Sequence, residues 1–445
     1  MEVQNNLGYT PEQMKKFTKN SWIVLLGFSI LYCFLYCGRL NLSAAMPAMA
    51  EQTSWDLQDL GIMSAIFFWT YGMGHLFNGR LGEIFGVNKF IVLGVILSAV
   101  ANVVLGLQES LVILCVCWGF NGYFQSMLWS PGIALLSQWW PGDKRGFATG
   151  FANAFSGFGQ VCATLSVVAA FAIAPGLGWR AAFILPVIPM LIMVVIYKIL
   201  VKDKPSKIGL PDYKEDDSER AEEEAQLRAV MAEKGKFYPY AHLFRQWRFD
   251  LWLVIIAGSS IARYGLLTWI PTYYVQEFDT DIQEGLLGSV LLPLGMAIGT
   301  FVVPWLTDKF CPNNRLPAVI ICAAVSGATV FGFMGVGPGV SAGALLFTAG
   351  FFIYAINGIV WAYATDVGGR VFAGTAAGIL DAFAYIGASV QALVFGSVLA
   401  HSNNWTLVFT CIVGVCAVIV VAAIIAGSGM NKNKTEAEAA DGGSN

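Results

Sequence analysis

Long apolar segments, each about as long as a membrane-crossing helix, alternate with short polar segments along most of the chain. A transmembrane helix needs about 20 mostly apolar residues. Segments of this kind cover residues 21–50, 58–80, 89–108, 111–140, 146–175, 180–200, 250–276, 283–307, 316–336, 340–366, 372–400 and 404–428. The pattern predicts an all-α polytopic membrane protein with twelve transmembrane helices.

A charged stretch divides these spans into two groups of six. The predicted organisation is a cytoplasmic amino-terminal tail, a first six-helix bundle, a cytoplasmic central loop, a second six-helix bundle and a disordered cytoplasmic tail. Their expected ranges are 1–20, 21–200, 201–249, 250–428 and 429–445. The last segment, NKNKTEAEAADGGSN, is too polar to build a packed core.

Composition agrees with a membrane protein and excludes several other classes. Only 12% of the residues are charged and 56% are hydrophobic, whereas soluble proteins carry roughly 25% charged residues. A net charge of −3 gives no indication of a nucleic-acid partner. The nine cysteines lack metal or redox spacing, and the sequence contains no nucleophile motif or nucleotide loop. We therefore expect no enzyme activity and no cofactor.

Basic residues predict how the chain crosses the bilayer. They gather before the first span and after the even-numbered spans, whereas the opposite loops are acidic, with Arg180 as their one basic residue. Cytoplasmic loops carry the excess of Lys and Arg. Both termini are therefore expected in the cytoplasm.

The two halves repeat one another. Arg39 lies eight residues before Pro47, and Arg263 lies eight residues before Pro271, an offset of 224. The cytosolic turns after the second and eighth spans align Glu83 with Asp308 at an offset of 225. Parallel six-helix repeats with a site near the midplane describe the major facilitator fold. The turn GRLGEIFGVNK (79–89) has the form that superfamily uses there, and Glu83 and Asp308 are the predicted gating residues.

Two arginines and one aspartate interrupt otherwise uncharged spans. An Arg at the centre of a membrane helix costs roughly 2.5–3.5 kcal/mol on insertion scales. Arg39 and Arg263 lie too deep for an easy exit to the interface, and their repeated placement argues against two separate accidents. Facing each other across the pseudo-twofold axis, they predict a cleft for an anion, because each guanidinium offers parallel donors to phosphate oxygens.

Several segments resemble the organophosphate:phosphate antiporter family over about residues 20–425. They are YCGRLNLSAAMP (36–47), ARYGLLTWIPTYY (262–274), AGTAAG (373–378) and YIGASV (385–390). The resemblance implies that Arg39 and Arg263 bind the substrate phosphate, in a bacterial cytoplasmic membrane. It also implies a cavity lined by Tyr32, Tyr36, Tyr71, Tyr354 and Tyr385, with Trp129 and Asn153 nearby.

Three positions depart from the glycerol-phosphate transporters of that family. Ser156 stands where they have His, His75 where they have Lys, and Asp381 where they have a small residue. His75 could be a coupling residue or a simple hydrogen-bond partner of Tyr71. Asp381, the repeat mate of Ser156, could bind a substrate ammonium, carry a coupled proton, or be a structural carboxylate.

These features predict a monomeric secondary transporter of a small phosphorylated organic anion, or a related phosphonate or other organic anion, that works by alternating access. Exchange for inorganic phosphate is implied by the resemblance, and proton symport is the alternative coupling. A membrane sensor of a sugar phosphate is the alternative from another class. The expected partners are therefore the organic anion, inorganic phosphate or a proton, and the lipid bilayer.

Overall fold

The computed structural model describes residues 9–140, 142–211, 225–226, 229–235, 238–311 and 314–428. Inside its helices, the side chains at 76, 80, 83, 142–143, 145–146, 239, 308, 365–366 and 368–374 are not described. The predicted tail at 429–445 and much of the predicted central loop lie outside the described residues.

The described chain is helical, and no strand occurs in it. The first half contains α1 (Pro11–Leu35), η2 (Tyr36–Gly38), α2 (Asn41–Gln52), α3 (Leu57–Phe85), α4 (Val87–Gly106), α5 (Leu111–Gln125), α6 (Trp129–Ser137), α7 (Gly142–Ile173), η3 (Pro175–Arg180), α8 (Ala181–Ile184), α9 (Val187–Leu200) and η4 (Pro205–Ile208). The second half contains α11 (Tyr238–Phe244), α12 (Trp247–Phe278), α13 (Ile282–Ser289), α14 (Leu291–Phe310), α15 (Leu316–Phe333), α16 (Val340–Ser402) and α17 (Trp405–Gly427).

Most of these elements belong to segments that can cross a membrane. Among the described residues, 11 helical segments are long and apolar enough to do so. They correspond to every predicted span except the second, and that segment forms α3, a helix of 29 residues. The predicted all-α polytopic class is confirmed.

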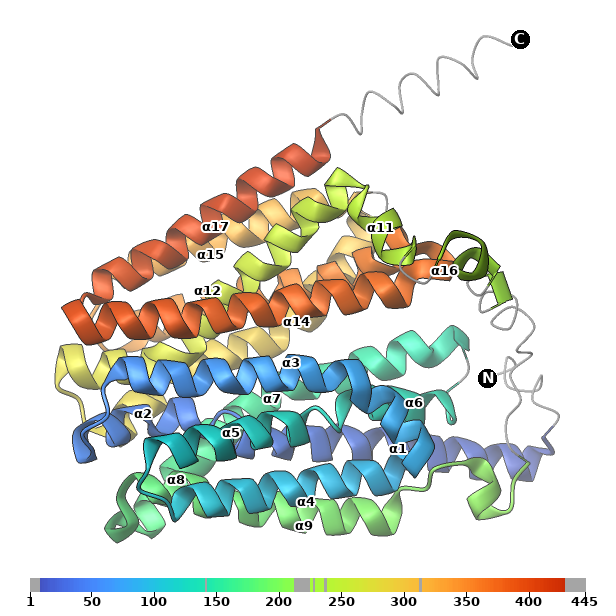
Figure 1. Cartoon of the computed structure of the whole chain (residues 1–445), viewed down its shortest axis with the longest axis horizontal. Coiled ribbons are helices and arrows are strands. Elements are labelled where there is room, and N and C mark those ends of the chain that lie inside the picture. Colours follow the sequence, from blue (N-terminus) through green and yellow to red (C-terminus); the bar gives the residue numbers. More distant parts are fainter. Residues whose placement is uncertain are drawn as a thin grey trace.

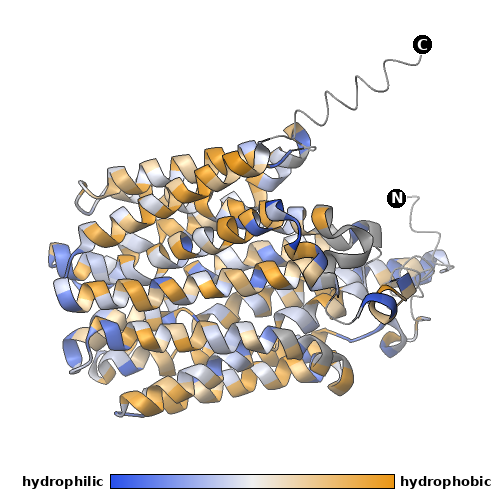
Figure 2. Cartoon of the chain, turned by 45° about the horizontal axis from the view of Figure 1, so that its top comes forward, coloured by the Kyte–Doolittle hydropathy of each residue, from blue (hydrophilic) through white to orange (hydrophobic). Residues whose placement is uncertain are grey.

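The two halves of the chain lie side by side, with α1 to α9 in the lower part of Figure 1 and α12 and α14 to α17 in the upper part. Contacts between α3 and α16, α7 and α14, and α2 and α12 join them. The amino-terminal end of α1 and the carboxyl-terminal end of α17 point to the same side. Figure 2 shows hydrophilic residues gathered at the two ends of the helices, with apolar residues along the sides.

Local sequence explains where several helices begin. Thr10 and Gln13 form a reciprocal capping box, and Pro11 occupies the first turn of α1. The two side chains accept hydrogen bonds from backbone N–H groups that a helix start leaves unpaired, and proline has no such N–H group. The helix therefore begins ten residues before the apolar segment does. Asp56 and Asp59 cap α3 in the same way.

The spans expected at 340–366 and 372–400 belong to one helical element, α16. Its segments Val340–Ala364 and Thr375–Ser402 each qualify as a span. No proline occurs between residues 340 and 402, so nothing in the sequence removes a backbone donor from the connection. The helical conformation accordingly continues through it.

Candidate functional site

Arg39 lies where the first membrane segment breaks. Helix α1 ends at Leu35, a 3₁₀ turn follows, and α2 begins at Asn41, so Arg39 stands between two helical pieces. Such a break frees backbone carbonyl groups, which need partners in an apolar environment. Asn121 and Asn102 donate to the carbonyl oxygen of Gly38 at 2.8 and 3.2 Å. The freed carbonyl of Gly38 is thereby satisfied by side chains.

These side chains belong to a buried amide network on α2, α4 and α5. Asn41 donates to Asn102 at 2.8 Å, Ser98 donates to Asn121 at 2.6 Å, and Gln125 donates to the carbonyl oxygen of Leu35 at 3.2 Å. All five side chains are at most 1% exposed. The network ties the broken segment to its neighbours and fixes the place from which the Arg39 side chain leaves the backbone.

Arg263, by contrast, lies within an unbroken helix. Helix α12 runs from Trp247 to Phe278 and contains both Arg263 and Pro271. No side-chain cap or helix end is therefore needed to place this guanidinium.

The two guanidiniums meet at one hydroxyl group. Arg39 and Arg263 each donate from a terminal nitrogen to the hydroxyl oxygen of Tyr264 at 3.1 Å. The two nitrogen atoms are therefore no more than twice that distance apart. Both side chains are buried, with 5% and 7% exposed. The predicted convergence of the two arginines, one from each half, is present in the structure.

Aromatic rings surround both arginines. The Arg39 guanidinium carbon lies 4.1 Å from the ring centre of Tyr71 and 5.1 Å from that of Tyr36. The Arg263 guanidinium carbon lies 4.3 Å from the ring of Tyr264 and 4.1 Å from that of Tyr354. Such contacts stabilise buried cations by about 2 kcal/mol each when desolvated. They help to offset the cost of holding two like charges close together.

Predicted residues of the first half form two groups around Arg39. Arg39 donates to the Tyr71 hydroxyl at 2.9 Å, and the Tyr71 ring lies 4.5 Å from the His75 ring. Tyr32 and Tyr36 have hydroxyl oxygens 3.4 Å apart, and the Tyr32 ring lies 4.9 Å from Trp129. All five thus belong to one continuous set of contacts that includes Arg39.

Predicted residues of the second half close the site from the other side. The Tyr385 ring lies 4.9 Å from that of Tyr71, which belongs to the first half. Tyr354, which stacks on Arg263, has its hydroxyl oxygen 3.2 Å from that of Ser156. Ser156 and Tyr354 therefore also join the two halves directly.

Asp381 is half-buried and lies within electrostatic range of Arg39 and Arg263. It forms no salt bridge or hydrogen bond with any other described residue. Asn153 lies one helical turn before Ser156 on α7 and likewise has no described hydrogen-bond partner. The side chains of Glu83 and Asp308 are outside the described residues, so their predicted gating role stays a prediction.

Sequence reasoning missed three components of this site. Tyr264 follows Arg263 directly and is the only described residue that contacts both guanidiniums by hydrogen bonds. Ser130 lies 3.1 Å from Nδ1 of His75 and replaces Tyr71 as its hydrogen-bond partner. The third is the amide network. Asn and Gln within the apolar runs SAVANVV (98–104) and WGFNGYFQ (118–125) were the available signal for it.

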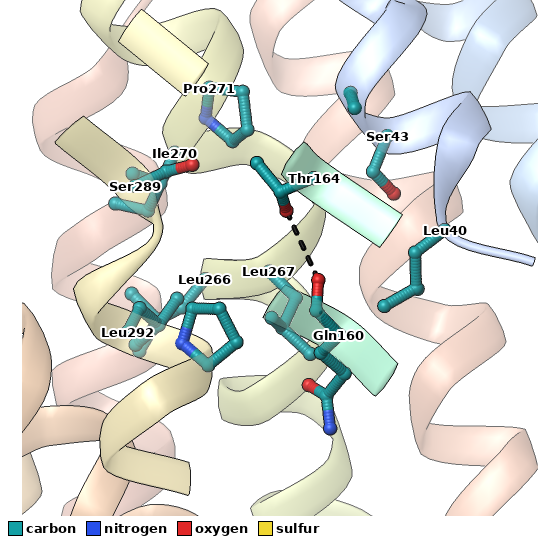
Figure 3. Close-up of a pocket in the computed structure, with 12 residues that line it drawn as sticks. Leu40, Ser43, Gln160, Thr164, Leu266, Leu267, Ile270, Pro271, Ser289 and Leu292 are labelled. Atoms are coloured by element: carbon teal, nitrogen blue, oxygen red, sulfur yellow. Dashed lines mark hydrogen bonds between the residues drawn. The ribbon is translucent and has the colours of Figure 1, made fainter. Parts of the chain in front are cut away.

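The space beside the arginines is small. A cavity of about 10 Å³ is bordered by Arg39, Leu40, Phe68 and Thr268, among others. A second one, of about 20 Å³, lies between α2, α7, α12, α13 and α14 and is lined by Ser43, Gln160, Thr164 and Ser289, among others (Figure 3). Each has room for about one water molecule at most. The two halves pack closely around the arginines, whose side chains are only 5% and 7% exposed. The described residues include no group of three His, Cys, Asp or Glu that could hold a metal.

Several known proteins are similar to this chain over most of its length. A probable hexose phosphate transport protein of Chlamydia trachomatis is 27% identical, covering 92% of this chain and 91% of that protein. A glycerol-3-phosphate transporter of Bacillus subtilis is 26% identical (89% and 90% covered), and the membrane sensor protein UhpC of Salmonella typhimurium is 26% identical (90% and 88%). The resemblance to transporters of phosphorylated compounds is confirmed.

A solved structure has the same fold. An inward-facing bacterial homologue of the human lysosomal transporter Spinster superposes with a TM-score of 0.71 at 17% identity, covering 92% of this chain and 96% of that chain. The family model of the Major Facilitator Superfamily matches residues 28–392. The chain thus belongs, as a membrane protein rather than an enzyme, to the Major Facilitator Superfamily.

Proposed function

We propose that this protein is a secondary transporter of a small phosphorylated organic anion, with Arg39 and Arg263 as the groups that bind the phosphate. One observation carries this proposal: guanidiniums from the two halves donate to a single oxygen, that of Tyr264. A phosphate offers several oxygens to the same donors and carries the charge that balances them. Tyr32, Tyr36, Tyr71, Trp129, Asn153, Ser156, Tyr354 and Tyr385 complete the proposed substrate site.

The names of the relatives support the substrate class. Two of them are called transporters of hexose phosphate and of glycerol 3-phosphate. We propose exchange for inorganic phosphate as the coupling mode, because inorganic phosphate presents the same oxygens to the arginine pair. Proton symport remains the alternative, with His75 and Asp381 as candidate carriers of the proton. The protein would act as a monomer in a bacterial cytoplasmic membrane, with both termini in the cytoplasm.

The closed contact between α3 and α16 supports transport by alternating access. A Cβ atom added to Gly61 would collide with the carbonyl oxygen of Ala392. A Cβ atom added to Gly396 would lie 2.7 Å from the carbonyl oxygen of Leu57. The halves thus meet backbone to backbone at the end where α3 begins, and we propose that this contact opens and closes during transport.

Purified protein in proteoliposomes tests the proposal. We expect uptake of labelled phosphate or hexose phosphate into vesicles loaded with phosphate, and little uptake into empty vesicles. Uptake that requires a proton gradient and no internal phosphate would favour symport. Absence of binding to any phosphate compound would overturn the proposal.

Gly61→Val tests the alternating-access step. The added side chain is expected to hold α3 and α16 apart, so that reagents from that side reach a cysteine placed near Arg39 faster than in the parent protein. Gly414→Val on α17 is the control, because a Cβ there meets no atom within 4 Å. Equal reagent access in both variants would contradict the proposed role of this contact.

A sensor is the second candidate, favoured by the similarity to UhpC. A sensor would bind sugar phosphates with the same arginines but would not accumulate them. Binding without uptake in the proteoliposome experiment identifies this case.

A further inference from the structure

Asp381 faces the same region as the arginine pair but is not used in binding a phosphate. It lies on α16 within electrostatic range of Arg39, Arg263, Tyr71 and Tyr385. It has no described hydrogen-bond or salt-bridge partner. A half-buried carboxylate inside a membrane-spanning segment normally has a partner, because an isolated charge is costly in an apolar environment. This carboxylate is therefore available to a ligand.

Aromatic rings connect the helical turn that carries Asp381 to Arg39. Tyr385 lies one helical turn after Asp381, on the same face of α16. Its ring packs 4.9 Å from the Tyr71 ring and 6.1 Å from the His75 ring. The Tyr71 hydroxyl in turn accepts a hydrogen bond from Arg39 at 2.9 Å. A ligand that binds the arginines and extends past the rings of Tyr71 and Tyr385 would reach the turn of α16 that carries the carboxylate.

The charge of the site favours one kind of ligand. Two guanidiniums and one carboxylate leave a single net positive charge. Near neutral pH a phosphate monoester carries almost two negative charges, since its second pKa is about 6. A monoester with an added ammonium therefore has a net charge near minus one, which neutralises the site. A monoester without the ammonium would leave excess negative charge in a low-dielectric environment.

We propose that Asp381, with the rings of Tyr71 and Tyr385, forms an ammonium subsite, so that the substrate is a phosphorylated or phosphonate amine of short chain length. The phosphate group lies between Arg39 and Arg263, and the ammonium lies at the Asp381 carboxylate. Ammonium groups are attracted both to carboxylates and to the faces of aromatic rings. This inference rests on the proposed function, which supplies the position of the phosphate.

Paired ligands test the subsite. Binding of phosphoethanolamine and ethyl phosphate, which differ by the ammonium group, is measured by calorimetry on the full-length purified protein. The parent protein is expected to prefer phosphoethanolamine by about tenfold or more, because a charged hydrogen bond contributes about 1.5–3 kcal/mol. In Asp381→Asn this preference should fall to about threefold or less.

Inorganic phosphate provides the internal control. Asp381→Asn should bind it as well as the parent protein or more tightly, since the change removes a negative charge near the arginines. Asp279→Asn, at an exposed helix end whose backbone has φ 51°, is the matched control and should change none of the three affinities.

Three outcomes are decisive. Equal affinity of the parent protein for the two ligands would overturn the ammonium subsite. So would an ammonium preference that survives in Asp381→Asn. If the parent protein bound none of the three phosphate compounds, the proposed function would instead be overturned. The two failures are therefore distinguishable.

Discussion

Arg39 and Arg263 occupy equivalent places in the two halves of the sequence, yet the backbone around them differs. Arg39 stands at a break between α1 and α2, whereas α12 continues through Arg263 without interruption. In both cases the guanidinium reaches the hydroxyl of Tyr264. Two different local structures therefore bring the two guanidiniums to the same hydroxyl group.

Buried amides account for the difference. Asn102, Asn121 and Gln125 satisfy the carbonyl groups that the break near Arg39 sets free. At the repeat offset of 224, the second half has Ser326, Leu345 and Ala349 in their place. Two of these three side chains offer no hydrogen bond, so a break in α12 would leave carbonyl groups unpaired in an apolar environment. The repeat conserves the arginine but not the backbone that carries it.

The largest expected effect comes from replacing either arginine with lysine. Arg39→Lys and Arg263→Lys should each weaken phosphate binding by roughly 3 kcal/mol, or more than hundredfold, because an ammonium cannot hold two oxygens in parallel. Calorimetry with inorganic phosphate measures the loss. Similar losses in the two variants would show that both arginines contribute equally to anion binding, although one lies at a helix break and the other within a continuous helix.

The control for this pair is Arg180→Lys. Arg180 forms a salt bridge with Glu109 at 3.2 Å near the surface and should leave phosphate affinity unchanged. If only one of the two buried arginine variants lost affinity, the paired site would be contradicted.

The next effect concerns the stability of the broken segment. Asn121→Leu removes the donor to Gly38 and the acceptor for Ser98, and it should lower the free energy of unfolding by about 2 kcal/mol. Ser326→Ala in the second half removes one hydrogen bond, to the carbonyl oxygen of Ala349, and should cost about 0.6 kcal/mol. Thermal unfolding in detergent measures both. Equal losses would mean that the amide network does not specifically support the break.

A smaller effect separates two roles of Tyr264. If its hydroxyl competes with the anion for the two guanidiniums, Tyr264→Phe should bind phosphate about tenfold more tightly, a gain of about 1.4 kcal/mol. Weaker binding would show that Tyr264 contacts the anion itself. Tyr274→Phe, farther along α12, should leave the affinity unchanged.

The smallest effect is expected at the hydrogen bond between Ser156 of the first half and Tyr354 of the second half. Ser156→Ala and Tyr354→Phe each remove the contact between their hydroxyl oxygens, and each should cost about 0.6 kcal/mol. In a double-mutant cycle of thermal stability, the double variant should lose no more than either single variant. Fully additive losses would show that the two hydroxyls do not interact.

The sequence by itself determined the membrane class, the position of the spans and the pairing of the two arginines. These features depend on local hydrophobicity and on the spacing of a repeat. Both are patterns along the chain and need no knowledge of which residues meet in space. The resemblance to the organophosphate:phosphate antiporter family implied Tyr36, Tyr71 and Tyr354, whose rings lie against the guanidiniums. The roles of Glu83 and Asp308 stay predictions.

Only the tertiary structure decided how the arginines are held. The break at Arg39 depends on amides from α4 and α5, and the shared hydroxyl of Tyr264 depends on the approach of α12 to the first half. Hydrogen bonds between helices join residues that are far apart in sequence, so hydrophobic periodicity does not encode them. The repeat already paired Asp381 with Ser156, and the packed helices add that it lies within electrostatic range of both arginines.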